Sequence, residues 1–302
     1  MNIQKLLNNQ NAGVYAMNLS RSLSPGTAKW VVKWISKWLA SNKKLPLVEG
    51  IRCNQWVAGG ENYTSDELSQ RAEMVLYQAG WSYYNLFHHY YQSEKLMNLV
   101  VFSPEFEEII QRSQEKRHGI IVAGVHLSNF DLVAQAAALR GLKAFVLSVP
   151  DPDKAIQWQH DLRRQSGLEI MDANLSNLRL AIRKLQDGET VVTGIDRPVP
   201  NPKMRPLFFG RPAHLAIHYV QLALRAKVPV IVMGAIMKED GLYHIHSSGE
   251  ILMKPHADRH IELDTNAERI LEVAQAIIGQ ALEQWLVFQP VWPESFPNIP
   301  ND

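Results

Sequence analysis

Residues 119–131 have the sequence GIIVAGVHLSNFD, and this stretch decides the fold class. The segment is apolar through Val125, which is typical of a strand buried on both faces of a parallel sheet. A helical pattern follows at residues 128–140 and closes at Gly141, so the chain passes from strand to helix through a short turn. His126 lies in that turn, at the carboxyl edge of the predicted sheet, where open α/β sheets form their sites.

The alternation of strand and helix extends toward the end of the chain. Further apolar runs of strand length occur at residues 144–149, 190–195 and 228–237. Helical patterns separate and follow them, at residues 153–166, 174–186, 212–226 and 265–286. A hairpin is predicted at residues 242–247 and 250–253, around Ser248 and Gly249. This order predicts an α/β fold with a central, mainly parallel or mixed sheet flanked by helices.

The first part of the chain, residues 1–98, predicts a helical region packed on an α/β core of residues 99–302. Helical periodicity is clear at residues 27–40 and again at residues 65–78, where Ser65 is the predicted N-cap. No low-complexity tract or long linker separates the two parts, so we expect them to form one structural unit.

The first of these helices has two sharply different faces. Trp30, Trp34 and Trp38 share one face of the predicted helix, whereas Lys33 and Lys37 share the opposite face. Three indoles opposite lysines suit the interface of an anionic bilayer, because indole prefers the headgroup boundary. The alternative is that the tryptophans pack onto the protein's own core and leave the lysines in water.

Composition excludes several classes of protein. The 302 residues are 46% hydrophobic and 20% charged, which argues against disorder. The 31 Lys and Arg balance the 30 Asp and Glu to a net charge of +1, so we expect no nucleic-acid partner. Cys53 is the single cysteine, which excludes an internal disulfide and a Cys-based zinc site. No apolar run reaches the ~20 residues of a membrane-spanning helix and no signal peptide is recognised, so we expect a cytoplasmic protein.

His126 and Asp131 form the sharpest candidate for a catalytic pair. Asp131 follows His126 by five positions and falls in the first turn of the predicted helix. We expect the turn to fold back so that this carboxylate holds one imidazole nitrogen. Such a pair fixes the tautomer and raises the basicity of the other nitrogen, which then suits proton removal from a hydroxyl. The spacing alone also fits a solvated histidine beside an acid at a helix N-terminus.

The wider sequence resembles a known family. His-x4-Asp after a buried strand resembles the glycerolipid acyltransferase motif, and GVHLSNFD is most similar to the branch containing the bacterial late acyltransferases of lipid A and the phosphatidylinositol mannoside acyltransferase. Further segments resemble that branch in the same order: LRRQSG at 162–167, LQDGETVVTGID at 185–196, LFFGRPA at 207–213, KVPVI at 227–231 and EQWL at 283–286. The resemblance covers residues 99–292. Arg197 follows Asp196 where the branch usually has Gln, and the spanning helix common in the lipid A enzymes is missing.

The resemblance implies an O-acyltransferase that moves a fatty acyl group from a thioester to a hydroxyl of a lipid or glycolipid acceptor. The donor would be acyl-coenzyme A or an acyl carrier protein thioester, with no cofactor, no metal and no covalent acyl-enzyme. His126 would be the general base and Asp131 would orient it. A lipid substrate favours membrane contact for residues 27–40, and implies a peripheral protein at the cytoplasmic face of the inner or plasma membrane.

Polar residues near predicted strand ends are candidates for substrate binding. Arg163 and Arg164 could hold a phosphate of the acceptor or of the donor, because guanidinium forks onto phosphate oxygens. Asp196 and Arg197 follow a strand end and could line the same cleft. The alternatives are a solvated helix face for the first pair and a local ion pair for the second.

An apolar segment is the candidate wall for the acyl chain. Phe208, Phe209 and Gly210 could lie along that chain, or they could be core contacts with a glycine in a turn. Residues 283–285, Glu-Gln-Trp, match the family pattern without a predicted chemical role, and we expect them to serve packing.

Two other functions fit the same residues. In the first, His126 activates water and the protein is a thioesterase or lipid hydrolase. In the second, the protein binds lipid or acts as a scaffold without catalysis. Dependence on an acceptor separates transfer from hydrolysis, and a substitution of His126 separates both from binding alone.

Overall fold

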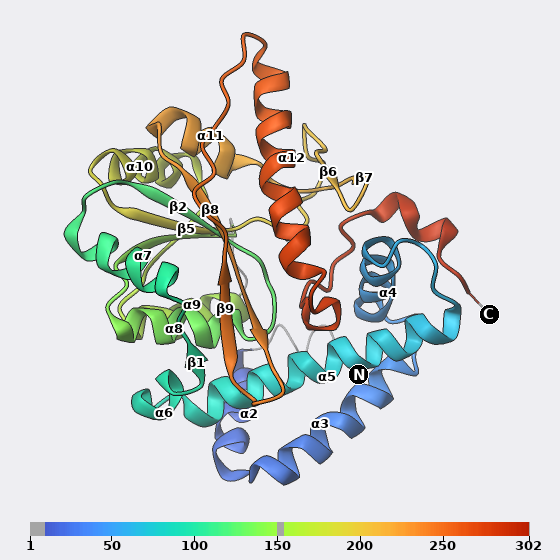
Figure 1. The fold of residues 1–302 in the computed structure, drawn as a ribbon. Helices are drawn as coiled ribbons and strands as arrows, with labels where there is room; N and C mark the ends of the chain where they lie inside the picture. The colour runs from blue at the N-terminus through green and yellow to red at the C-terminus, as the bar shows by residue number, and fades with distance from the viewer. Residues whose placement is uncertain (1–9, 150–153, 302) are drawn as a thin grey trace.

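The computed structural model describes residues 10–149 and 154–301, and its centre is a seven-stranded sheet with helices on both faces (Figure 1). The strand order across the sheet is β1-β9-β8-β2-β5-β3-β4. The strands are β1 (Val100–Val101), β2 (Ile120–Gly124), β3 (Ala144–Ser148), β4 (Glu169–Asp172), β5 (Thr190–Gly194), β8 (Val230–Met237) and β9 (Tyr243–Ser247). Among these seven strands, the β8–β9 pair alone is antiparallel and the other neighbours are parallel. The prediction of a mainly parallel, mixed sheet is confirmed.

Strand β2 lies inside the sheet, between β5 and β8. Its side chains alternate between two hydrophobic clusters: Ile121 and Ala123 face one, whereas Ile120 and Val122 face the other. This is why the strand is apolar throughout its length and not at every second position.

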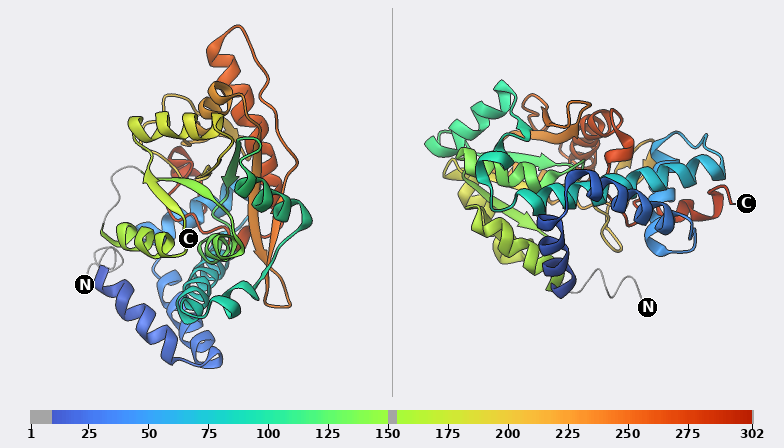
Figure 2. Two further views of the ribbon diagram at one scale, coloured as in Figure 1. Left: turned by 90° about the vertical axis from the view of Figure 1, so that its left-hand side faces the viewer. Right: turned by 90° about the horizontal axis from the view of Figure 1, so that it is seen from below.

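Helices from residue 104 onward cover the two faces of the sheet (Figures 1 and 2). They are α7 (Pro104–Glu115), α8 (Phe130–Arg140), α9 (Lys154–Gln165), α10 (Leu175–Gln186), α11 (His218–Ala226) and α12 (Arg259–Ile278). Apolar residues of α7, α8 and α9 join the cluster on one face, and those of α10, α11 and α12 join the cluster on the other. The start predicted for the helix now called α9, at residue 153, lies outside the described residues.

From residue 10 to residue 98 the N-terminal region is mainly helical, as the sequence pattern predicts. Its helices are α2 (Gln10–Ser22), α3 (Pro25–Ala40), α4 (Pro46–Ala58), α5 (Ser65–His89) and α6 (Ser93–Met97). Asn85 of α5 donates its amide to the Tyr243 hydroxyl at 2.7 Å, and the Asn129 amide donates to the Ser82 carbonyl at 2.8 Å. These bonds place α5 across the carboxyl end of the sheet, with α3 on its far side (Figure 1).

Helix α5 is longer than predicted, and its cap lies one residue earlier. Thr64 is the N-cap, because its side chain accepts from the Glu67 N–H while the Glu67 carboxylate accepts from the Thr64 N–H. The aromatic segment at residues 81–89 continues the helix and buries Tyr84 and Phe87, so the pattern does not end at residue 78.

The predicted hairpin at residues 242–253 is wrong in its partner strand. Residues 243–247 pair with β8 through a turn at residues 238–242, where Gly241 adopts a positive φ of 78°. Of the second predicted strand, Ile251 forms an isolated bridge with Val230. The turn signal lies at Asp240–Gly241, whereas the prediction placed it at the following Ser-Gly pair.

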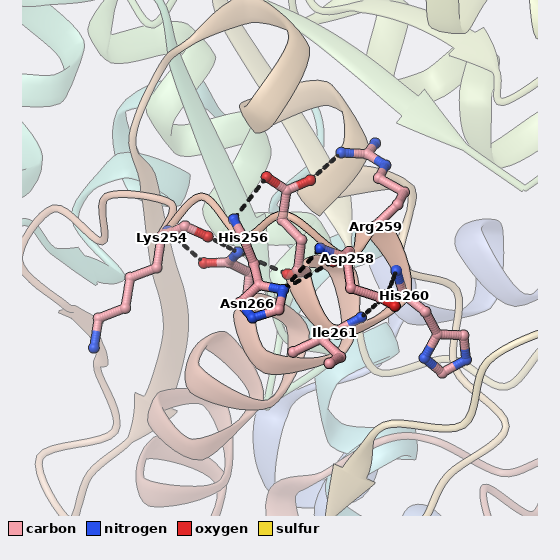
Figure 3. Close-up of polar contacts among 8 residues, drawn as sticks. Lys254, His256, Asp258, Arg259, His260, Ile261 and Asn266 are labelled. Carbon is pink, nitrogen blue, oxygen red and sulfur yellow. Dashed lines mark hydrogen bonds and ion pairs between the residues drawn. The ribbon is translucent and has the colours of Figure 1, made fainter.

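Helix α12 begins six residues before its predicted start at residue 265, because Asp258 caps it (Figure 3). The Asp258 carboxylate accepts from the backbone N–H groups of His260 and Ile261 at 2.7 and 3.1 Å. The helix ends at Ile278 and a short 3-10 helix, η1 (Leu282–Gln284), follows. A further 3-10 helix, η2 (Pro293–Asn298), and the small β6 (Leu207–Phe208) and β7 (Arg211–Pro212) hairpin complete the fold.

Candidate active site

Two parallel strands bring a histidine and a carboxylate together. His126 follows β2 and Asp196 follows β5, and the two strands are in register with Gly124 opposite Gly194. Nδ1 of His126 lies 2.5 Å from Oδ1 of Asp196, and the His126 backbone N–H donates to Oδ2 at 2.7 Å. Since a carboxylate accepts hydrogen bonds, Nδ1 carries the proton and Nε2 presents its lone pair.

The predicted contact between His126 and Asp131 is not formed. Asp131 instead accepts from Nε and Nη2 of Arg163, at 2.6 and 2.5 Å. The cause lies in how the helix begins: Asn129 is the N-cap of α8, so Asp131 already belongs to a regular turn that faces α9, where Arg163 lies in the last turn. The carboxylate that pairs with His126 is that of Asp196, which follows the neighbouring strand β5.

Asp196 is fully buried and receives a further donor, the indole Nε1–H of Trp285, at 2.8 Å. Burial opposes the charge of this carboxylate. The adjacent His126 and the hydrogen bonds from His126 and Trp285 outweigh burial, so the pKa of Asp196 lies below its ordinary value. Asp196 is therefore an ionised acceptor near neutral pH.

His126 lies against the backbone of β5 because Gly194 has no side chain. A Cβ atom at Gly194 would lie 2.6 Å from Cε1 of His126, closer than non-bonded atoms approach. The imidazole also meets the ring of Phe130 edge-on, with centroids 4.7 Å apart. Burial lowers the pKa of His126 and the charge of Arg197 lowers it further, although Asp196 opposes both. The imidazole is accordingly neutral near pH 7, the state a general base requires.

A cavity of about 330 Å³ opens at His126. This volume is within the roughly 300–1,000 Å³ typical of small-molecule sites. Much of its wall is apolar and belongs to the α8 face of the sheet, formed by Val122, Val133, Ala137, Leu142 and Met233. A second part reaches residues of the opposite face, among them Thr193 and His218, whose Oγ1 and Nε2 atoms lie 2.8 Å apart.

Charged groups line the same cavity beside His126. They are Asp131 and Arg163, which pair with each other, and Arg197. Arg197 is half-buried with its guanidinium 5.9 Å from the Phe130 ring centroid, and among the described residues no carboxylate forms an ion pair with it. Burial lowers the pKa of Arg197, but a guanidinium stays protonated in proteins. The site thus holds one positive charge without a matching salt bridge.

The structure places the other predicted substrate-binding residues elsewhere. Arg164 pairs with Asp161 and donates to the Ile170 carbonyl, outside the cavity wall. Phe208, Phe209 and Gly210 belong to the β6–β7 hairpin, which packs its two rings against Trp285 and Trp292. Among the residues that the structure describes, the lining of the cavity does not include Phe208, Phe209 or Gly210.

The sequence interpretation missed two residues of the site, Trp285 and Gly194. Trp285 belongs to the Glu-Gln-Trp segment, which matches the family pattern but whose sequence alone indicates no chemical role. Gly194 ends a predicted strand directly before Asp196, and a glycine at the edge of a sheet can mark close approach of another group.

The tryptophans of α3 do not pack onto the core, so that alternative is wrong. Trp30, Trp34 and Trp38 are 70%, 62% and 53% exposed, whereas α3 buries Ala28, Ser36 and Ala40. None of the helices that the structure describes is both long and apolar enough to cross a bilayer.

Comparison with known families fits this geometry. A model of the bacterial lipid A biosynthesis acyltransferase family matches residues 101–294, which include the strands β2 and β5 together with His126, Asp131, Asp196 and Trp285. A search of curated proteins found no match. Because the family match covers more than half of the chain, the protein belongs to the bacterial lipid A biosynthesis acyltransferase family and is an acyltransferase.

Proposed function

We propose that this acyltransferase moves a fatty acyl group from a thioester to a hydroxyl of a lipid or glycolipid acceptor, with His126 as general base and Asp196 as the carboxylate that holds it. The observation that carries the proposal is the His126–Asp196 pair, 2.5 Å apart, at an apolar cavity. Asp196 replaces Asp131 in the orienting role, because Asp131 is engaged by Arg163.

The proposed step needs no cofactor, since a thioester is already activated. Nε2 of His126 takes the proton of the acceptor hydroxyl while the hydroxyl oxygen forms a bond to the carbonyl carbon of the thioester. The tetrahedral intermediate then collapses, the C–S bond breaks, and the thiolate takes the proton from the imidazolium. The products are an ester and a thiol, and no covalent acyl-enzyme forms.

Arg197 is the group best placed to stabilise the oxyanion of that intermediate. It is half-buried, lines the cavity with His126, and carries a charge that no carboxylate of the described residues pairs with. A fixed cation near developing negative charge contributes more in a water-poor site than in solvent. Arg163 is already neutralised by Asp131, so we assign that pair to shaping the site beside His126.

The apolar part of the cavity is the proposed site for the acyl chain. It lies between α8 and the sheet and is formed by aliphatic residues such as Val122, Val133 and Ala137. Burial of methylene groups there contributes about 0.8 kcal/mol each. Both acyl-coenzyme A and acyl carrier protein thioesters remain candidate donors.

The proposed membrane contact involves α3. Its three tryptophans are exposed, and residues 1–48 contain lysine and arginine but neither aspartate nor glutamate. Exposed indoles in a stretch that carries basic but no acidic residues favour a bilayer surface with anionic lipids, such as the cytoplasmic face of the inner or plasma membrane. Helix α5 separates α3 from the carboxyl edge of the sheet, so this contact would bring the membrane to the side of the molecule that carries His126 (Figure 1).

The test is acceptor dependence. Purified protein is given lauroyl-, myristoyl- or palmitoyl-coenzyme A, or the matching acyl carrier protein thioesters, with and without an under-acylated lipid A precursor, a lysophospholipid or a glycolipid. We expect thiol release to rise with one acceptor and the acylated lipid to appear by mass spectrometry. Equal thiol release with and without acceptor, and no acylated lipid, would instead support a hydrolase. No turnover with any pair would support lipid binding alone.

A further inference from the structure

The segment at residues 282–286 contacts both members of the proposed catalytic pair. Trp285 is 1% exposed, and its indole N–H donates to Oδ2 of Asp196 at 2.8 Å. We infer that Trp285 is a positioning residue for the acyl transfer: its indole N–H fixes the Asp196 carboxylate, which in turn holds His126. This inference rests on the proposed function.

The two oxygens of Asp196 have separate partners. Oδ2 accepts the backbone N–H of His126 and the indole N–H of Trp285, which leaves Oδ1 to the imidazole Nδ1. A carboxylate with one donor on Oδ2 can rotate about its Cβ–Cγ bond more easily than one with two. The indole therefore restricts the plane of the carboxylate, and with it the direction of the imidazole.

The backbone of the same segment holds the loop that carries His126. Leu286 N–H donates to the His126 carbonyl at 2.8 Å, and the Gln284 carbonyl accepts from Ser128 N–H at 2.7 Å. Ser128 has a φ of +51°, a backbone conformation that residues other than glycine adopt at an energetic cost. The segment thus supports a strained turn beside the base in addition to the carboxylate behind it.

Gln284 anchors this segment to the end of β8. Its side-chain amide donates to the Met237 carbonyl and its oxygen accepts from the Met237 N–H, both at 2.9 Å. Gln55 of α4 donates to the Leu282 carbonyl at 2.8 Å. These bonds give the Gln-Trp pair a role that its sequence alone does not show: one residue fixes the segment and the next reaches the carboxylate.

The indole ring is itself held by packing. Its neighbours are Phe208, Phe209 and Trp292, with ring centroids 6.0, 6.1 and 6.2 Å away. The Phe-Phe segment that the sequence suggested as an acyl wall thus contributes to the orientation of Trp285. Trp292 offers a matched control, because it is equally buried in the same cluster but its indole points at the Arg211 carbonyl, 3.4 Å away.

The experiment compares Trp285→Phe with Trp292→Phe. Each change trims an indole from the same cluster, but only the first removes a donor from Asp196. For Trp285→Phe we expect kcat to fall about tenfold, from the loss of one hydrogen bond to a charged group, with KM for the acyl thioester unchanged. For Trp292→Phe we expect kcat within about twofold of the unchanged protein, because phenylalanine keeps an aromatic ring in the cluster beside Trp285 and no bond to the catalytic pair is lost. Thermal unfolding of both variants shows how much of any loss comes from packing.

The pH profile separates positioning from packing. With one donor fewer, the Asp196 carboxylate is a stronger acceptor for the imidazolium, so the pKa of His126 should rise. The acid limb of kcat should therefore move to higher pH in Trp285→Phe and stay in place in Trp292→Phe. In the unchanged protein, the NMR signal of the Trp285 indole N–H should shift through the titration of His126, a readout that needs neither substrate nor variant.

Two results would overturn the inference. One is the same kcat and acid limb in both variants, and the other is an indole signal that does not follow His126. Asp196→Asn and His126→Gln serve as references for the reaction itself. If these two keep full turnover, the proposed function fails; if they lose turnover while Trp285→Phe matches its control, only the role of Trp285 fails.

Discussion

At the scale of single residues, the chemistry depends on how two carboxylates are divided between two partners. Asp196 is fully buried and holds His126, whereas Asp131 holds Arg163. The imidazole is kept neutral by burial and by the nearby Arg197, and it is oriented by a carboxylate that stays ionised. A neutral base with a fixed tautomer is the state that proton removal from an alcohol requires.

The division of roles predicts unequal effects for the two carboxylates. Asp196→Asn puts an amide opposite Nδ1 and can favour the wrong tautomer, so we expect acyl transfer to fall by about 10²- to 10⁴-fold. Asp131→Asn should cost less, roughly tenfold, because it loosens Arg163 without touching the imidazole. Initial rates under saturating thioester measure both. A larger loss in Asp131→Asn than in Asp196→Asn would contradict this assignment.

The glycine beside the imidazole gives a second prediction at this scale. Gly194→Ala places a methyl group 2.6 Å from the present position of Cε1, so His126 must move and kcat should fall by at least about tenfold. Gly124→Ala is the control, because a Cβ there meets only the Thr193 carbonyl at 3.9 Å. The turnover rates of the two variants check this prediction, and their melting temperatures show whether both retain the fold. Equal activity in both would mean that the close approach has no consequence.

At the scale of elements, the sheet decides which residues meet. The sequence predicts β2, β3, β5 and β8 within a few residues, because buried parallel strands are apolar throughout. It does not show that β5 inserts between β2 and β3, since the order of strands depends on packing between helices far apart in the chain. The partner of His126 lies 70 positions away, whereas spacing could suggest only the neighbouring Asp131. The reaction class was therefore predictable from local motifs, and the pairing within the site was not.

Helix α11 carries a titratable group that links pH to stability. Burial lowers the pKa of His218 to about 4, below the ordinary value of 6.5, so the folded protein resists protonation there. The neutral His218 therefore contributes to the stability of the folded protein fully above pH 6.5. This contribution is lost as the pH falls from 6.5 toward about 4, because the unfolded chain binds the proton first. Between pH 7 and 5 we expect a loss of about 1–2 kcal/mol in the free energy of unfolding from this group.

His218→Gln checks this assignment, because glutamine can still bond to Thr193 but does not titrate. Denaturant unfolding at the two pH values should show a smaller pH-dependent loss in the variant than in the unchanged protein. Identical losses would place the pH sensitivity in other groups.

At the scale of the whole molecule, the charge is unevenly distributed. The chain carries a net charge of +1, yet residues 1–48 contain no acidic residue. The exposed tryptophans of α3 lie in this cationic region, and the start of α12 lies at the opposite end of the molecule (Figures 1 and 2). The N-terminal helices and the α/β core are joined by buried hydrogen bonds such as Asn85 to Tyr243, which supports the proposal that they form one unit. A surface that binds lipid can then hold the site in a fixed relation to the membrane.

This arrangement predicts which face binds vesicles. Changing Trp30, Trp34 and Trp38 together to Ala should weaken binding to vesicles containing phosphatidylglycerol by about tenfold or more, because the indoles supply interfacial anchoring. The control changes Leu252 and Ile261 to Ala, which are 65% and 48% exposed near the start of α12. Vesicle co-sedimentation with and without the anionic lipid measures both. Equal binding of the two variants would remove α3 from the membrane contact.

We propose that the imidazole of His126 removes the proton of a lipid hydroxyl beside a fatty thioester. The most direct measurement is formation of the acylated lipid by His126→Gln and by the unchanged protein, followed by mass spectrometry, with thermal unfolding to confirm an intact fold. We expect the variant to fold and to form the ester about 10²- to 10⁴-fold more slowly. Ester formation at an unchanged rate by the folded variant would contradict it.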